Sequence, residues 1–244
     1  IVEEKNYGAY LETAGFFDIA NRKLRYNAGV RWIYTNQLIS GPITITVPRN
    51  ATLAAGGQYP NTFPYAVTKH NYQAFLPSLN TVFEVTDDFQ VRAAISRTMT
   101  RANPTTMLPG LNFSDQAAAS ASLGNPGLKP FFSNNIDLGA EYYTGGAGVF
   151  SVAVFRKALS GFTVSQTSTV PFSFLAPYGV QFATLSPTQQ AGITSRGGPT
   201  AATINLAQQV NAAGLLTVNG MEFNWVQPLD FLLADWVGIE GMGF

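Results

Sequence analysis

The chain has 244 residues, of which 46% are hydrophobic and only 11% charged, and its formal net charge is zero. Ordinary soluble domains carry about 25% charged residues, so the low charge argues against a fully solvated surface, and the neutral balance gives no reason to expect nucleic acid as a partner. The absence of cysteine excludes disulfides, zinc–thiolate sites and iron–sulfur clusters.

The chain shows a two-residue hydrophobic period. From residue 23 to residue 32 every even position is apolar, whereas the odd positions are Lys23, Arg25, Asn27, Gly29 and Arg31. A strand sends alternate side chains to opposite faces, so one face is apolar and the other polar. The same pattern predicts eight strands, at about residues 2–17, 22–40, 70–86, 89–102, 132–144, 149–166, 214–227 and 236–244.

The connections between these strands alternate between short and long. The joins at 18–21, 87–88, 145–148 and 228–235 are short, whereas those at 41–69, 103–131 and 167–213 are long. Asp87-Asp88 and the glycines of 145–148 suit tight hairpins. Strict short–long alternation is typical of outer-membrane barrels, with short periplasmic turns and long external loops. The sequence therefore predicts an all-β fold, an antiparallel up-and-down transmembrane β-barrel.

The apolar face of these strands is predicted to meet lipid. Its members are Leu24, Tyr26, Val30, Trp32, Val91, Ile95, Leu138, Phe150, Val152 and Val154. Aromatic residues suit the girdles at the two lipid interfaces, and we assign Trp32, Tyr34, Tyr142, Phe150 and Trp225 to them. A soluble β-sandwich also alternates, but its solvent face is normally dense in lysine and glutamate. Here the polar positions favour asparagine, serine and glycine, as a filled or water-lined lumen would.

Two stretches resemble one family. Residues 75–80 read FLPSLN, followed by TDD at 86–88 and RAAISRTMTR at 92–101. Residues 124–130 read GNPGLKP and lead to SNNIDLGAE at 133–141, and VNGMEFN at 218–224 is similar to a later strand. Together they resemble the barrel of TonB-dependent receptors, nearest to the branch common in Caulobacter- and Xanthomonas-like bacteria. Phe131 and Phe132 depart from the family, which usually has an acidic residue after the Lys-Pro pair.

The resemblance implies that residues 1–244 are part of a barrel domain of about 22 strands, with the plug domain and the TonB box absent. About eight strands would then form an open curved sheet, and the terminal Phe244 would be a coincidental match to the last aromatic of finished barrels. It also implies an outer-membrane receptor that binds a scarce solute and imports it with energy from TonB. The expected partners are TonB, outer-membrane lipid and a small solute such as a carbohydrate or siderophore, with carbohydrate favoured; no enzymatic activity and no cofactor are expected.

Two other functions stay open at this point. A passive porin-like or structural barrel would lack energy coupling, and a plug with a TonB box upstream of Ile1 would distinguish active transport from it. A soluble β-rich binding module would partition into the aqueous phase without detergent.

Solute binding is expected on the side of the long loops. We assign it to four polar or aromatic residues there, Arg101, Asn134, Tyr178 and Arg196, and we expect no metal ligand. His70 is the only histidine, and we interpret it as a loop residue at the start of a strand.

Two carboxylates, Asp137 and Glu141, share a predicted strand face, with Arg31 and Arg92 close to them. We expect ion pairing across the barrel wall or with the plug, and no catalytic role.

Overall fold

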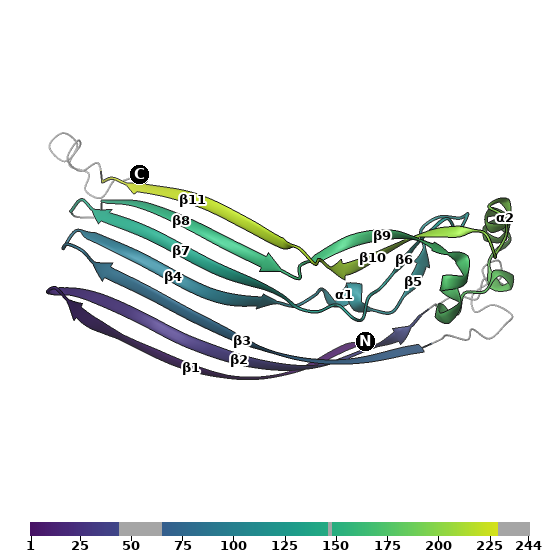
Figure 1. Ribbon diagram of the computed structural model, residues 1–244, viewed down its shortest axis with the longest axis horizontal. Coiled ribbons are helices and arrows are strands. Elements are labelled where there is room, and N and C mark those ends of the chain that lie inside the picture. Colours follow the sequence, from purple (N-terminus) through teal and green to yellow (C-terminus); the bar gives the residue numbers. More distant parts are fainter. Residues whose placement is uncertain (44–64, 146–147, 229–244) are drawn as a thin grey trace, which may run out of the picture.

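The computed structural model describes residues 1–43, 65–145 and 148–228 (Figure 1). Seven strands form one sheet in the order β1-β2-β3-β4-β7-β8-β11, and every pair in it is antiparallel. Their bounds are β1 Val2–Ile19, β2 Arg22–Pro42, β3 Tyr65–Glu84, β4 Phe89–Thr100, β7 Phe131–Tyr143, β8 Val149–Ser160 and β11 Leu215–Val226. Seven of the eight predicted strands are therefore confirmed, and the eighth, 236–244, lies outside the described residues.

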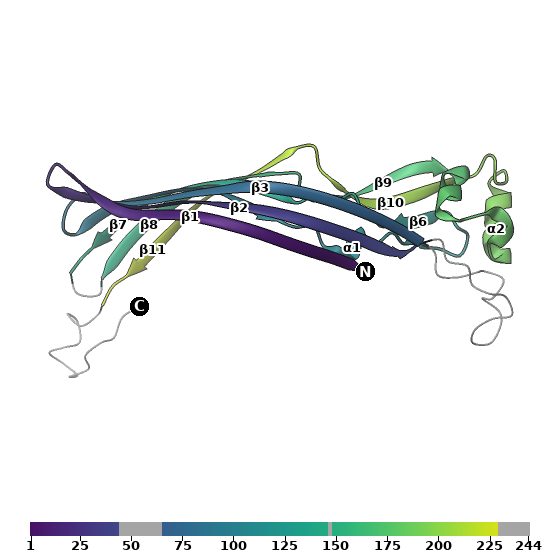
Figure 2. The same cartoon turned by 90° about the horizontal axis from the view of Figure 1, so that it is seen from below.

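The sheet is open and bends along its length (Figure 2). β1 and β11 stand at its two ends, and within the part of the chain that is described they do not pair with each other. This confirms the expected open, curved fragment of a barrel wall.

The long loops hold a second sheet, which the sequence patterns did not predict. Its four strands, in the order β5-β6-β10-β9, are β5 Leu111–Phe113, β6 Ser120–Leu123, β10 Thr203–Asn211 and β9 Thr163–Pro171. The β6–β10 pair is parallel, a departure from the predicted all-antiparallel arrangement. The loops also form α1 Pro104–Met107, α2 Pro187–Ser195 and two 3-10 helices, η2 Phe172–Tyr178 and η3 Phe182–Thr184.

A glycine divides the predicted strand 149–166 between the two sheets. β8 ends at Ser160, Gly161 adopts a φ of 70°, and β9 begins at Thr163. This left-handed backbone conformation is one that glycine adopts without steric cost, so the chain leaves the barrel wall here and starts the small sheet. The prediction of a continuous strand was wrong at this point.

The small sheet has a hydrophobic core of its own. Twelve buried residues from β5, β6, β10, η2, α2 and their connections pack together: Leu111, Ala118, Ala121, Leu123, Phe172, Leu175, Val180, Leu185, Ile193, Ala202, Ile204 and Leu206. α2 is fixed at its start by a capping box, in which Ser186 and Gln189 each bond the other's backbone N–H. None of the helices among the described residues has the length and apolar character needed to cross a membrane.

The ladder pairing assigns side chains to the two faces of the large sheet. Residues paired directly across neighbouring strands point to the same face, and Val30 stands level with Leu11 on β1 and Pro77 on β3. All ten predicted lipid-facing residues fall on this one apolar face. The opposite face carries most of the charged side chains of the strands.

Pro77 marks where β3 and β4 separate. The β3–β4 ladder runs from Glu84 to Ser78 and stops there, whereas the β2–β3 ladder continues past Pro77 to Tyr65. Proline lacks the backbone N–H that a ladder needs. The FLPSLN segment therefore frees the chain after β4 to turn away from the wall.

Candidate functional site

The polar face of the large sheet is held together by side-chain pairs between strands. Asn27 Nδ2 donates to Glu12 Oε1 at 2.5 Å, and Arg25 lies 2.6 Å from Glu84. Arg92 Nε lies 2.8 Å from Glu141 Oε1, and Gln90 and Tyr143 also bond this carboxylate. The expected pairing of Glu141 with Arg92 is confirmed.

At the loop end of the same face, Arg101 connects three segments of the chain. Its guanidinium donates to Asn6 Oδ1 at 2.8 Å and to Tyr72 Oη at 3.2 Å, and lies 3.6 Å from Glu4. Gln37 donates to the same Glu4 carboxylate at 2.7 Å. The chain that leaves β4 is thereby tied to β1 and β3.

The segment after Arg101 then folds onto this polar face. α1 begins with Asn103, whose side chain caps the backbone N–H of Thr105. Met107 is buried against Ile39 and Leu128. The loop end of the polar face is thus covered by α1, and a cleft remains beside it.

The GNPGLKP segment fastens the small sheet to the wall. Gly124 is needed for space, since a Cβ there would stand 1.6 Å from the Leu108 carbonyl oxygen. Asn125 Nδ2 donates to the carbonyl of Gln209 on β10 at 2.8 Å, and its Oδ1 accepts from Gly127 N at 2.9 Å.

Asn211, at the end of β10, completes this connection. It accepts from Lys129 N at 2.9 Å and donates to the carbonyls of Lys129 and Gly161 at 2.9 and 2.7 Å. The segment that carries the family resemblance is therefore a structural joint.

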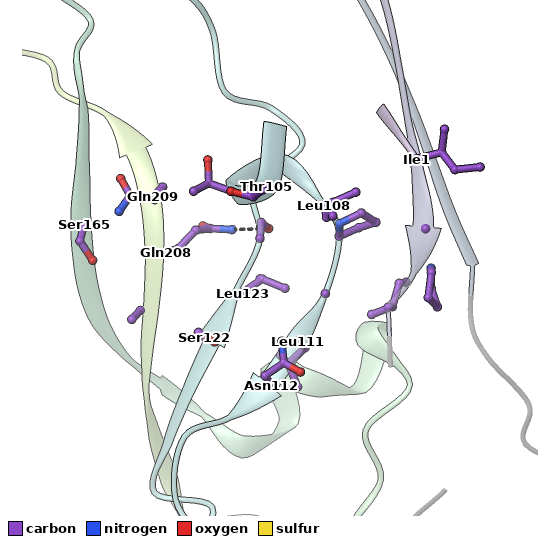
Figure 3. Close-up of a pocket in the computed structure, with 18 residues that line it drawn as sticks. Ile1, Thr105, Leu108, Leu111, Asn112, Ser122, Leu123, Ser165, Gln208 and Gln209 are labelled. Carbon is purple, nitrogen blue, oxygen red and sulfur yellow. Dashed lines mark hydrogen bonds between the residues drawn. The ribbon is translucent and has the colours of Figure 1, made fainter. Parts of the chain in front are cut away.

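A cleft of about 540 Å³ lies between the end of β2, α1 and the small sheet (Figure 3). Thr105 and Leu108 come from α1 and the residue that follows it, Asn112 and Ser122 from the neighbouring strands β5 and β6, and Gln209 from β10 (Figure 3). The side-chain amide of Gln208 donates a hydrogen bond to the Gly124 carbonyl at 3.2 Å.

The cleft lining contains no ionisable side chain among the described residues. Its polar groups are hydroxyls and amides, which both donate and accept hydrogen bonds. Exposed aliphatic surface from Ile1 and Leu108 lies beside them. The lining therefore offers hydrogen-bond donors and acceptors without a charged side chain.

The loop 115–120 is fixed from two sides at the far end of the small sheet. The Asp115 carboxylate accepts from the backbone N–H groups of Ala117, Ala119 and Ser120 at 2.9, 2.9 and 2.6 Å. The bond from Ala119 is the largest of the effects that lower the pKa of Asp115. From the other side, Arg196 donates to the carbonyls of Ala117 and Ala118 at 3.2 and 2.8 Å.

The family model for the "TonB dependent receptor-like, beta-barrel" matches residues 1–239. The chain belongs to the TonB-dependent receptor β-barrel family. Its seven-stranded sheet is accordingly a section of an outer-membrane barrel wall, and the family is one of transport receptors rather than of enzymes. In such a wall the apolar face meets lipid and the polar face lines the lumen. No curated protein sequence matches the chain.

Solved TonB-dependent receptors are similar in fold. The Serratia marcescens hemophore receptor HasR, as a double mutant with its hemophore HasA and heme, gives a TM-score of 0.55 at 15% identity, covering 91% of this chain and 32% of that chain. A mutant ferric enterobactin receptor, PfeA, from Pseudomonas aeruginosa in complex with enterobactin gives 0.50 at 18% identity, covering 93% and 34%. At such identities the likeness shows the fold alone, and the chain spans about a third of these receptors.

The four predicted site residues do not come together in this section of a TonB-dependent receptor barrel. Arg101 joins the polar cluster on the lumen face. Asn134 pairs with Arg97 and lies on the opposite, apolar face. Tyr178 packs against the core of the small sheet, and Arg196 holds the loop 115–120. Their role in solute binding stays a prediction.

His70 lies inside β3, which begins five residues earlier than predicted, at Tyr65. The interpretation of His70 as a loop residue at the start of a strand was therefore wrong, because His70 lies within the strand. Its side chain belongs to the lumen face, level with Gln37. Its Nε2 atom is buried and has no hydrogen-bond partner among the described residues.

The sequence patterns did not identify the cleft residues Asn112, Ser122 and Gln209, because these residues lie in the long connections, where no strand was predicted. Two signals were present. Residues 203–206 read TINL, a short alternating strand pattern. Ser186 followed three residues later by Gln189 is the sequence signature of a helix N-terminus.

Proposed function

We propose that this chain forms part of the wall and the solute-binding end of an active-transport receptor in the bacterial outer membrane. The solute binds at the loop side and enters the cell when the energised TonB protein acts on a plug domain. The plug and the TonB box belong to other parts of the full-length protein, and no bond in the solute is made or broken. Family membership over residues 1–239 supports this function over a passive barrel.

The cleft carries the proposal for the solute class. Uncharged hydroxyl and amide groups, from Asn112, Ser122 and Gln209 among others, line it together with aliphatic surface. A small number of placed polar groups within apolar surface is the usual composition of small-molecule sites. A carbohydrate offers hydroxyl groups that these side chains bind in both directions, and it needs no compensating charge. We therefore favour carbohydrate over an anionic ferric siderophore.

The test is uptake by cells that produce the full-length protein. Radiolabelled oligosaccharides and a ferric siderophore are supplied in parallel, with and without a protonophore and in a strain without TonB. We expect oligosaccharide uptake that requires both TonB and the proton gradient. Uptake that survives loss of TonB would support the passive barrel, and uptake of the siderophore alone would contradict the assigned solute class.

A double variant, Asn112→Ala with Gln209→Ala, tests whether the cleft holds the solute. Each lost hydrogen bond costs about 1 kcal/mol, so we expect the half-saturating concentration to rise by about tenfold or more with little change in the amount of folded protein. Thr200→Ala is the matched control, because Thr200 is exposed and lies just before β10 of the same small sheet. It should leave uptake unchanged. An unchanged double variant would exclude this cleft as the binding site.

A further inference from the structure

The lipid-facing side of the wall carries a polar patch at its loop side. On four adjacent strands the apolar run that starts at the turns gives way to one polar residue: Arg97 on β4, Asn134 on β7, Arg156 on β8 and Asn219 on β11. Arg97 pairs with Asn134, and Arg156 pairs with Asn219. All four are exposed. They form one contiguous group, which we call the outward patch.

The position of the outward patch fits the edge of the hydrocarbon layer. On β1 the apolar run ends toward the loops at Lys5, whereas Arg156, followed strand by strand through the ladders, stands level with Thr13. Lys5 and Thr13 are eight residues apart, which is about 26 Å along β1. From β8 to β1 there are five strand-to-strand steps, which together span about 24 Å across the sheet. Strands tilted by about 45° produce this offset when a horizontal boundary crosses them. Lys5 and Arg156 therefore lie at a similar height.

The two arginines of the outward patch, Arg97 and Arg156, have no ionic partner in the described part of the chain. The seven strands place a single carboxylate on the lipid-facing side, that of Glu3, and Lys5 already pairs with it at 3.3 Å. Two exposed arginines thus stand at the edge of an apolar belt with no carboxylate beside them among the described residues, and they are available to an anion from outside the chain.

The guanidinium of Arg97 contacts a neighbouring aromatic ring. Its Cζ lies over the ring of Phe132 at 4.6 Å from the centroid, a cation–π contact. Guanidinium donors match phosphate oxygens in geometry and charge, and the neighbouring amides of Asn134 and Asn219 add neutral donors. We propose that the outward patch binds the phosphate of a lipid head group in the loop-side leaflet.

Native mass spectrometry of the full-length protein in detergent tests this proposal. Phosphatidylglycerol, which is anionic, and phosphatidylcholine, which is zwitterionic, are added in equal amounts. An anionic lipid gains about fivefold in affinity for each arginine near the head group, so we expect a clear preference for phosphatidylglycerol that is largely lost in an Arg97→Gln and Arg156→Gln double variant. Dimers of the protein formed through this patch, in place of bound lipid, would overturn the proposal.

The matched control removes the same two charges from the lumen face, as Arg31→Gln with Lys157→Gln. Both residues point away from lipid, so this variant should keep the preference. Equal loss of preference in the two double variants would mean that total charge decides binding, and it would exclude the outward patch as the site. A second double variant, Arg97→Lys with Arg156→Lys, keeps both positive charges. It should retain part of the preference for phosphatidylglycerol.

Discussion

Arg101 and Asn6, 95 residues apart in the sequence, are joined by a 2.8 Å hydrogen bond across the lumen face. Asn6 also accepts from Thr35 at 2.7 Å, so its carbonyl oxygen bridges β2 and the segment that follows β4. This contact directs the chain after β4 over the lumen. α1, which forms one wall of the cleft, begins three residues after Arg101.

Replacing Arg101 by alanine should loosen the segment 101–108. The variant loses bonds to Asn6 and Tyr72 and the ion pair with Glu4, and partly exposed contacts of this kind contribute about 1 kcal/mol in total. We expect faster hydrogen exchange in this segment and unchanged exchange in the strand core of β7. Arg101→Lys should retain only part of the protection, and equal protection in the alanine variant and the unmodified protein would show that α1 is held by Met107 alone.

Replacing Val30 by arginine should destabilise the barrel by about 2–4 kcal/mol if this position lies near the membrane midplane. Val30 stands between Leu11 and Pro77 on the apolar face. Asn27→Ala on the lumen face loses one bond to Glu12 and should cost about 1 kcal/mol. Denaturant unfolding of the full-length protein in lipid vesicles measures both, and equal costs would mean that the two faces are assigned wrongly.

Asp115→Asn should loosen the loop 115–120 at neutral pH. Because the folded-state pKa of Asp115 lies below its unfolded value, the carboxylate stabilises the fold above about pH 4, and this stabilisation is lost as pH falls through the folded pKa. The asparagine variant lacks it at every pH. Hydrogen exchange of Ala119 and Ser120 should therefore differ between the two proteins at pH 7 and converge at the lowest pH that the barrel tolerates.

The neighbouring substitution Gln116→Ala serves as the control for this experiment, because Gln116 is exposed and its side chain bonds none of these amides. It should leave exchange unchanged. A difference between the Asp115 variant and the unmodified protein that is the same at all pH values would contradict the assigned role of the ionised carboxylate.

Gly124→Ala should disrupt the joint between the small sheet and the wall. A methyl group there would meet the Leu108 carbonyl oxygen at 1.6 Å, and backbone must move to relieve this contact. We expect loss of most solute uptake while the barrel still inserts. Gly214→Ala is the control, since no atom lies within 4 Å of a Cβ there, and similar uptake by the two variants would show that the joint does not shape the cleft.

The long connections predicted at 41–69, 103–131 and 167–213 should have their loop parts outside the cell, although residues 65–69 belong to β3. The chain contains no cysteine, so Thr200→Cys in the small domain and Asp88→Cys in the β3–β4 turn report the two sides separately. A membrane-impermeant maleimide added to intact cells should label the first variant and spare the second until the cells are lysed. Labelling of Asp88→Cys alone would reverse the proposed topology.

The sequence by itself determined the barrel wall. Alternation in a strand is a local property, so the predicted set around Val30 and Leu138 reached the correct face without knowledge of any pairing. The turn residues Asp87 and Asp88 were equally informative, since β3 ends at Glu84 and β4 begins at Phe89, on either side of them. The family resemblance added the fact that such strands belong to a larger barrel.

Only the tertiary structure decided what the long loops do. The bonds of Asn125 to β10 and of Arg196 to residues 117 and 118 join positions about 80 residues apart, and no local period encodes such contacts. The same holds for Asn134. Its place near the long loops predicts a solute-binding residue, but the strand register places its side chain on the lipid-facing side. Side-chain alternation says which residues share a face, whereas pairing between distant segments decides which of them meet.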